Sequence, residues 1–253
     1  MRRAEREALA LGLLHGPAEL VPVSSSGHVA AIPWLLGWEV AEWDGERRKE
    51  LEVALHAGTA LALLIVARPR QVRPRLLAAA VLPPALAGLA LERRIEQRLG
   101  TPATLAAGLL AGGLALVVSD RVAVTRSADD ASVRDGAWLG LAQAAALVPG
   151  VSRSGATLAA ARWLGFSRAD ASRLSWEVAL PVLLGATGLK AWRVQRNGPA
   201  PTALALGAGA AFASTLATAS AIGIERRAPL WPWGVWRAGL AAAILAVRQN
   251  RGR

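Results

Sequence analysis

The amino-acid sequence predicts an all-α polytopic membrane protein, as its composition, its apolar segments and its charge pattern indicate. Of its 253 residues, 53% are hydrophobic, and the mean hydropathy is +0.34. A soluble domain of this length usually carries more charge and shorter apolar stretches. Because cysteine is absent, a disulfide framework, a thiolate zinc site and a cysteine nucleophile are excluded.

Apolar segments recur along the whole chain. A helix needs about 20 apolar residues to cross a hydrocarbon core of about 30 Å, and several of these segments are shorter. Two pieces that follow Gly/Ser-rich turns, Val29–Gly37 and Ala156–Gly165, are too short to cross, and we expect them where a helix enters the bilayer, turns and leaves. The longer candidates are Ala8–Val23, Val53–Ala67, Leu76–Leu91, Ala103–Val118, Gly136–Pro149, Leu174–Trp192, Thr202–Ile224 and Trp231–Val247.

Basic residues lie in short runs between the apolar segments. The formal net charge is +11, and the cations are nearly all arginine. A nucleic-acid-binding protein would also be basic, but it would carry that charge on a soluble fold. We therefore interpret the runs as loops near anionic lipid headgroups, and we expect the lipid bilayer rather than nucleic acid as a partner.

The two halves of the chain repeat. Shifting the sequence by 128 residues aligns Ser24 with Ser152 and Gly27 with Gly155, and the register holds through the flanking apolar segments. Internal repeats in membrane proteins often have opposite topology and share a site at their interface, although the alignment alone does not decide whether this repeat is inverted. We expect one membrane domain over residues 1–253, with repeats at about 1–118 and 136–253 and a linker at 119–135.

Two hydroxyl-rich turns, one in each repeat, carry the residues best suited to chemistry. Each places serines and a glycine before a helix start, where unpaired backbone N–H groups and the helix dipole favour an anion. In the first turn, His28 follows Ser25 by three residues and Ser24 by four, so it could reach either hydroxyl as a base or an acid. The first turn reads ELVPVSSSGH from Glu19, and the second reads PGVSRSGAT from Pro149.

Arg153 gives the second turn a permanent positive charge. Its planar fork suits phosphate oxygens, and an arginine within apolar sequence normally marks function because it is costly in a bilayer. Ser26, Ser154 and Thr157 are more ambiguous, since hydroxyls in apolar helices often bond back to the backbone or to a neighbouring helix. For each of these three residues, an anion-binding role and a structural role are about equally favoured.

These two turns resemble the two signature motifs of the undecaprenyl-diphosphate phosphatase family, the BacA-type bacitracin-resistance proteins. The family motifs are E-G-x-x-E-F-L-P-x-S-S-T-G-H and P-G-x-S-R-S-G-x-T, and this chain matches the second at every defining position. The resemblance extends through Leu51–Thr59, Gly140–Gln143, Leu164–Pro181 and Pro232–Arg237, so it covers most of the chain.

By this resemblance, the protein would hydrolyse undecaprenyl diphosphate to the monophosphate and so recycle the lipid carrier of cell-wall peptidoglycan synthesis. It would be a multi-pass protein of the bacterial inner (cytoplasmic) membrane. The implied fold is an inverted repeat with two re-entrant helical hairpins that meet at a cleft, and the implied cofactor is a divalent metal, Mg²⁺ or Ca²⁺. The oligomeric state stays open, with a homodimer as one option.

The resemblance also implies roles for individual residues. Glu19 would be a catalytic carboxylate or a metal ligand. Ser25 and His28 would be the nucleophile and its base, and which of the two attacks phosphorus stays open. Arg153 would complete the catalytic set. The residues implied in binding the diphosphate are Ser24, Ser26, Ser152, Ser154 and Thr157.

The chain departs from the family at His15, where the family has Glu or Gln four residues before Glu19. The two side chains share a helix face but suit Mg²⁺ or Ca²⁺ less well than two carboxylates; a softer metal and a proton-carrying role for His15 both stay open.

Glu177 is a second departure from the family pattern, because a carboxylate in an apolar stretch needs a partner. We hypothesise that it pairs with His15 or replaces the missing carboxylate. His56 and Glu52 are weaker candidates, for which a place in the cleft and a helix–helix hydrogen bond are equally favoured.

A membrane transporter or flippase for a polyprenyl-phosphate lipid is the main alternative, because repeats and broken helices suit it equally well. The chemical groups are divided unequally, however. Glu19 and His28 occur only in the first repeat, and Arg153 occurs only in the second. That division of a base and an anion clamp favours phosphoryl chemistry. An acid-phosphatase-like enzyme is excluded, since that class needs a later histidine and the chain has none beyond His56.

Overall fold

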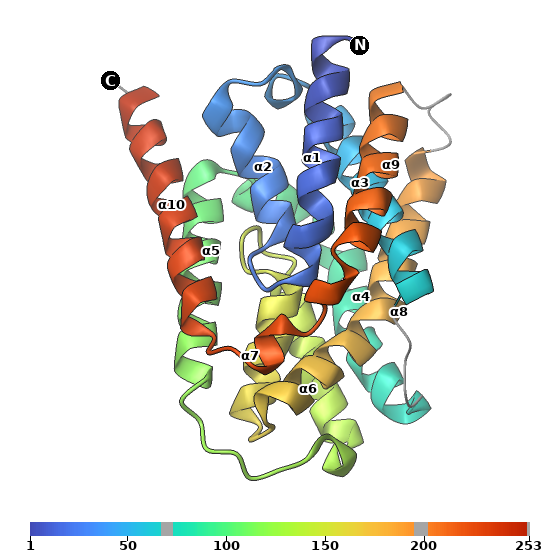
Figure 1. Ribbon diagram of the computed structural model, residues 1–253, viewed down its shortest axis with the longest axis vertical. Helices are drawn as coiled ribbons and strands as arrows, with labels where there is room; N and C mark the ends of the chain where they lie inside the picture. The colour runs from blue at the N-terminus through green and yellow to red at the C-terminus, as the bar shows by residue number, and fades with distance from the viewer. Residues whose placement is uncertain (67–72, 195–201, 252–253) are drawn as a thin grey trace. The chain divides into compact units, whose positions relative to one another are not determined.

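The computed structural model describes residues 1–66, 73–194 and 202–251, and in these residues the protein is all α-helical (Figure 1). The one strand-like pairing in this part of the chain is an isolated bridge between Arg126 and Phe166. Ala67, the end of one expected apolar segment, lies outside the described residues. The α-helices are α1 (Arg3–Leu20), α2 (Ser25–Leu36), α3 (Gly45–Val66), α4 (Pro74–Leu99), α5 (Pro102–Ser119), α6 (Val133–Ala145), α7 (Arg153–Trp163), α8 (Arg168–Val194), α9 (Thr202–Ala217) and α10 (Trp231–Arg251), with short 3-10 turns at Glu39–Ala41, Ala128–Asp130, Ala219–Ala221 and Ile224–Arg226.

The chain forms two compact units, each assembled from segments distant in sequence. In unit 1, helix α9 packs against both α1 and α3. In unit 2, α4 packs on α6, and α5 packs on both α7 and α10. Unit 1 comprises Met1–Leu20, His28–Arg68 and Leu183–Ile222, and unit 2 comprises Val21–Gly27, Pro69–Val182 and Gly223–Arg253.

Two helices in the described residues are long and apolar enough to cross a membrane. These are the first 18 residues of α4, Pro74–Leu91, and all of α5. Only 17% of the α4 window and 44% of the α5 window is buried, whereas a core helix of a soluble protein would be mostly buried. Soluble monomers rarely expose large continuous apolar surfaces, so the exposed leucines of α4, Leu82, Leu86 and Leu89, fit contact with lipid.

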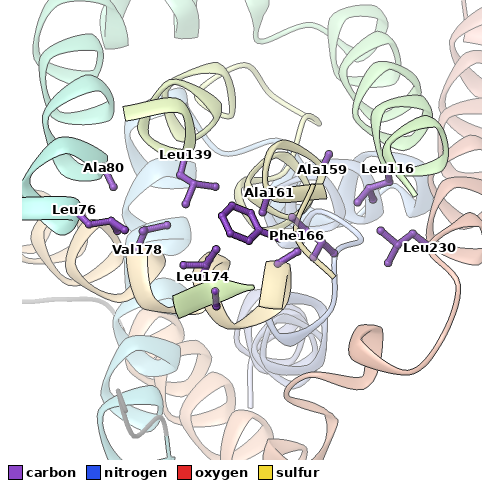
Figure 2. Close-up of a cluster of buried hydrophobic side chains, with 13 residues drawn as sticks. Leu76, Ala80, Leu116, Leu139, Ala159, Ala161, Phe166, Leu174, Val178 and Leu230 are labelled. Atoms are coloured by element: carbon purple, nitrogen blue, oxygen red, sulfur yellow. The ribbon is translucent and has the colours of Figure 1, made fainter. Parts of the chain in front are cut away.

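Each unit has its own apolar core. In unit 1, Leu11 of α1, Leu55 of α3 and Leu204 of α9 belong to one buried cluster. In unit 2, Phe166 lies at the centre of a cluster to which α4, α5, α6, α7 and α8 all contribute (Figure 2). Phe166 is fully buried and directly follows Gly165, which has a φ of +87°. The cluster thus fixes the end of α7 and the start of α8 relative to each other.

Several local features recur at the spacing of 128 residues. Helices α2 and α7 begin at Ser25 and Arg153, and the residue before each has a positive φ. Two glycines with positive φ, Gly37 and Gly165, follow these two helices at the same spacing. Gly12 and Gly140, which have the same spacing, each lie at a close contact between two helices. A Cβ on Gly12 of α1 would meet the α9 backbone at Gly207, and one on Gly140 of α6 would meet the carbonyls of Ala79 and Ala80 on α4.

The polar segment 119–135 is held by ion pairs. Asp120 accepts hydrogen bonds from Arg168 at 2.6 and 2.8 Å and from the Leu230 N–H at 3.0 Å. Burial opposes its ionisation, but these bonds and the charges of Arg168 and Arg162 leave its pKa below the usual value. At the other end, burial likewise opposes ionisation of Asp135. Hydrogen bonds from Arg126 and Ser132 nevertheless lower its pKa to about 2.

Candidate active site

The two serine turns have the same unusual backbone. Ser24 has a φ of +74° and Ser152 a φ of +69°, and they are the non-glycine residues with positive φ in the described chain. This region is unfavourable for a residue with a Cβ, at a cost of about 1–3 kcal/mol, and such strain is concentrated at functional sites. Each serine hydroxyl accepts a hydrogen bond at 3.3 Å from the N–H three residues later, at Gly27 and Gly155 respectively. Each turn is therefore a cap that starts a helix.

Small residues on α5 allow the second turn to lie directly on that helix. A Cβ on Gly108 would meet the Pro149 carbonyl, and one on Gly112 would meet the Val151 carbonyl at 2.5 Å. Gly150 adopts a φ of +91° and approaches the α5 backbone at Leu105. The close contact of the Pro149-Gly150 pair with the α5 glycines thus fixes the position of Ser152 relative to α5.

Arg237 of α10 joins the two turns. Its Nε donates to the Pro22 carbonyl at 2.8 Å, and its Nη1 donates to the Val151 carbonyl at 3.1 Å. The side chain is completely buried, and its Nη2 has no hydrogen-bond partner in the structure. A Cβ on Gly155 would overlap that guanidinium, so glycine is required there for Arg237 to reach the turns. No carboxylate pairs with Arg237 among the described residues.

The electrostatics of these turns favour an anion. The first turns of α2 and α7 present backbone N–H groups, which carry the positive end of each helix dipole. A buried guanidinium lies beside both turns, and Arg153 adds a second, half-buried one at the start of α7. Ser154 lies half-buried in the same turn, with its hydroxyl 3.3 Å from that of Ser152. Two guanidinium groups beside two helix N-termini suit a phosphate group.

The hydroxyl groups predicted to bind substrate differ in their surroundings. Ser24, Ser25 and Ser152 are buried, and Ser26 is half-buried. The Thr157 hydroxyl lies 3.0 Å from the Arg153 carbonyl and 2.5 Å from the Ser175 hydroxyl of α8. These contacts of Thr157 lie within the protein and hold α7 to α8.

A second cluster of polar side chains lies in unit 1, where α1 carries His15 and Glu19 and α3 carries His56. One ligand atom from each of the three residues lies within 4.8 Å of the other two. His56 Nε2 is 4.0 Å from Glu19 Oε2, and the two imidazole rings meet edge to face with centroids 4.5 Å apart. His15 and Glu19 are buried, and His56 is half-buried. The i,i+4 spacing of His15 and Glu19 thus places both on one face of α1, as the sequence predicts.

Glu177 has arginine partners that the sequence analysis missed. Its Oε2 accepts a hydrogen bond from Arg73 Nη2 at 2.9 Å, and its Oε1 accepts one from Arg173 Nε at 3.1 Å. Arg73 also donates to the Ala128 carbonyl at 2.8 Å. The expected need for a partner is therefore met by two arginines rather than by His15. Both Glu177 oxygens are engaged in unit 2, so we assign Glu177 a structural role.

The remaining predicted residues are distributed between the units. His28 belongs to unit 1 with His15 and Glu19, and it lies on α2 one turn after Ser25. Sequence reasoning gave Arg237 no role, although a lone arginine in the apolar segment of α10 is a signal of the same kind as Arg153. The predicted residues that belong to unit 2 are Ser24, Ser25, Ser26, Ser152, Arg153, Ser154, Thr157 and Glu177.

Comparison with known proteins identifies the family. A family model described as bacitracin resistance protein BacA matches residues 8–243. The chain belongs to the BacA family. The undecaprenyl-diphosphatase of Geobacter sulfurreducens is 35% identical over 266 residues, which cover 94% of this chain and 96% of that protein. Proteins with the same name from Geobacter metallireducens (35% over 264 residues, covering 93% and 95%) and Gemmatimonas aurantiaca (33% over 268 residues, covering 97% and 98%) are also similar.

The Mg²⁺ or Ca²⁺ expected for a BacA-family protein fits the unit 1 cluster poorly. Both ions take oxygen ligands, and Ca²⁺ takes six to eight of them. Here His15 and His56 offer nitrogen atoms, and Glu19 is the one carboxylate of the cluster. The donor set therefore differs in chemistry from the one that the family resemblance implies.

Proposed function

We propose that this chain hydrolyses undecaprenyl diphosphate to undecaprenyl phosphate and inorganic phosphate, and so returns the lipid carrier to cell-wall synthesis. Membership of the BacA family gives the reaction. The observation in the structure that best supports it is the buried Arg237 guanidinium between the two serine turns. A buried charge costs several kcal/mol unless an opposite charge compensates it. A diphosphate bound at the turns would supply that opposite charge.

The two turns suggest how the diphosphate is held. Backbone N–H groups at the starts of α2 and α7, with Arg153, would contact its equatorial oxygens and stabilise the charge that develops in the transition state. The hydroxyls of Ser24, Ser26, Ser152, Ser154 and Thr157 are the further binding groups that we propose. The prenyl chain would lie along apolar helix surfaces that open to lipid.

The chemical step proposed is in-line attack on the terminal phosphorus. Either Ser25 Oγ attacks while His28 takes its proton, or His28 attacks directly. The bond between the terminal phosphorus and the bridging oxygen breaks, and undecaprenyl phosphate leaves. Water then hydrolyses the phosphorylated residue and releases inorganic phosphate. The role proposed for Glu19, by the family resemblance, is that of a further catalytic carboxylate. No step is assigned to Mg²⁺ or Ca²⁺, because the cluster at Glu19 lacks the oxygen ligands these ions prefer.

We also propose the finer architecture that the resemblance implies: an inverted repeat in a multi-pass inner-membrane protein, with re-entrant hairpins formed around α2 and α7. The shared positive φ at Ser24 and Ser152 supports a repeat. The helix packing supports it as well. Helices α4 and α9 begin at equivalent positions of the two repeats, Pro74 and Thr202, and each packs on the first helix of the other repeat: α9 on α1, and α4 on α6. Two helices of 12 and 11 residues are too short to span a bilayer. A homodimer remains part of this proposal.

Phosphate release by the purified protein tests the function. Undecaprenyl diphosphate in detergent micelles is the substrate, and wild type is compared with Arg153→Ala and, as a control, Arg248→Ala in the exposed end of α10. We expect Arg153→Ala to lose at least about 100-fold in turnover, as removal of one transition-state donor does in other enzymes, while Arg248→Ala stays near wild type. Near-normal turnover of Arg153→Ala would refute the site. If wild type releases no phosphate but moves the lipid from one leaflet of a proteoliposome membrane to the other, the transporter alternative is correct.

A further inference from the structure

We propose that His15, Glu19 and His56 form a binding site for a borderline transition-metal dication, of which Zn²⁺ is the type, with His15 Nε2, His56 Nε2 and a Glu19 carboxylate oxygen as the three protein ligands. One ligand atom from each of the three residues lies within 4.8 Å of the other two. All three residues belong to unit 1, so the site needs no residue from elsewhere.

Thr59 contacts one ring nitrogen of His15 and leaves the other, Nε2, available for a ligand. Thr215 Oγ1 lies 2.6 Å from the Ala211 carbonyl and 3.2 Å from Thr59 Oγ1. Thr215 donates to Thr59, and Thr59 Oγ1 keeps a second lone pair for a hydrogen bond from His15 Nδ1 at 2.9 Å. The metal-binding tautomer of His15 is the one in which Nδ1 donates to Thr59 and Nε2 carries the lone pair.

The same arrangement holds for His56. Its Nδ1 lies 2.8 Å from the main-chain carbonyl of Glu52, one turn earlier on α3. A carbonyl oxygen can only accept, so the proton of His56 also lies on Nδ1. Its Nε2 faces Glu19, with 4.0 Å between Nε2 and Oε2. Metal-binding histidines are typically held like this, with the other ring nitrogen donating to a protein oxygen.

The buried Nε2 of His15 is the observation that argues most directly for a ligand. It has no hydrogen-bond partner in the structure, and His15 is completely buried. A buried polar atom without a partner is costly and rare in native proteins. A cation bound by this atom, His56 Nε2 and the Glu19 carboxylate would give His15 Nε2 the partner that it lacks.

The chemistry of the ligands selects the class of ion. Imidazole nitrogens suit Zn²⁺ and its transition-metal neighbours, whereas Mg²⁺ and Ca²⁺ prefer oxygen. Two histidines and one glutamate are also the protein ligands of a known class of zinc sites that keep one position open for water or substrate. In this chain the histidine at position 15, in place of the family carboxylate, changes the preferred ion from hard to borderline.

Metal binding to the full-length protein in detergent tests this inference without any lipid substrate. The protein is stripped with a chelator and titrated with Zn²⁺ in excess Mg²⁺, and bound metal is counted by elemental analysis. We expect one Zn²⁺ per chain, retained in the presence of Mg²⁺. His15→Gln and His56→Gln should each weaken Zn²⁺ binding at least about 10-fold, and Thr59→Val should weaken it by about the same factor through loss of the bond to His15.

The chain contains three histidines, and His28 provides the matched control. His28→Gln should bind Zn²⁺ as wild type does. Equal losses in His28→Gln and His15→Gln would overturn the site, as would Mg²⁺ displacing Zn²⁺ from wild type. In case a variant fails to fold, Co²⁺ bound to wild type gives a second readout. Intense visible absorption is expected from a four- or five-coordinate ion, and the weak absorption of a six-coordinate ion would contradict the proposal. Because no turnover is measured, the result stands apart from the proposed phosphatase reaction.

Discussion

Arg237 Nε donates to the main-chain carbonyl of Pro22 at 2.8 Å, across 215 residues of sequence. The same guanidinium reaches the Val151 carbonyl, so one side chain fixes the backbone of both serine turns. In the described residues its hydrogen-bond partners are these two carbonyls, so no carboxylate there neutralises its positive charge. Its role is to position the two turns and to increase the positive electrostatic potential there.

Replacing Arg237 should impair both turns together. Arg237→Lys keeps the charge but cannot form the two-carbonyl fork, whereas Arg237→Met keeps much of the volume and removes the charge. We expect both variants to lose about 10- to 100-fold in turnover, with a larger rise in KM for Arg237→Met because it removes positive charge. Phosphate release over a range of substrate concentrations separates the two effects. Equal kinetics for wild type and Arg237→Met would contradict the role.

Gly155 and Gly27 are equivalent positions of the two repeats, but they should differ in how well they tolerate alanine. In Gly155→Ala, the Cβ would overlap the Arg237 guanidinium, which is buried and has little room to move. In Gly27→Ala, the nearest atom is the Ser24 hydroxyl oxygen at 2.9 Å, the end of a short side chain. We therefore expect Gly155→Ala to lower the melting temperature by several degrees more than Gly27→Ala. Thermal unfolding in one detergent measures both, and the reverse order would show that Arg237 is not the constraint.

Asp135 should make stability depend on pH in the acid range. Its pKa falls from the usual 3.8 to about 2 in the folded protein, so the unfolded chain binds its proton first as pH drops. The stabilisation is therefore fully present above about pH 4 and is lost as the pH falls toward 2. It amounts to at most about 2 kcal/mol, and partial exposure of Arg126 reduces it.

Asp135→Asn should remove this dependence. At pH 7 the variant should be less stable than wild type, and near pH 2 the two should converge. Denaturation of both proteins at a series of pH values provides the measurement. A constant gap between them from pH 7 to pH 2 would show that the carboxylate charge contributes nothing. Ser127→Ala, which removes a nearby cap without changing charge, is a control whose effect should not vary with pH.

Glu177→Gln should reduce stability without changing metal binding. The carboxylate bridges Arg73 and Arg173, and its loss removes the shared anion of these two guanidinium groups, although Arg173 keeps its ion pair with Asp129. We expect a cost of about 3 kcal/mol, typical of breaking a buried pair from one side. Bound metal per chain should equal that of wild type. Loss of metal from Glu177→Gln, with stability unchanged, would restore the earlier hypothesis that Glu177 replaces a ligand.

Much of the local structure follows from the sequence. A helix start beside each turn was expected from the serine and glycine pattern, since a serine that caps a helix leaves a clear signal. The helices begin at Ser25 and Arg153, ahead of the expected apolar pieces Val29–Gly37 and Ala156–Gly165. The pairing of His15 with Glu19 on one face followed from their spacing. Arg237, Arg73 and the contact of His56 with His15 did not, because each depends on which helices pack together, and sequence periodicity carries no information about that.

The sequence by itself determined the helical class, the membrane character, the two serine turns and the departure at His15. These depend on local composition and spacing, which act through the backbone over a few residues. Only the tertiary structure decided that Glu177 pairs with arginines, that Arg237 joins the turns and that His56 completes a cluster with His15 and Glu19. Those contacts join residues far apart in the chain, and they exist because packing of apolar helix surfaces brings the polar groups within bonding distance.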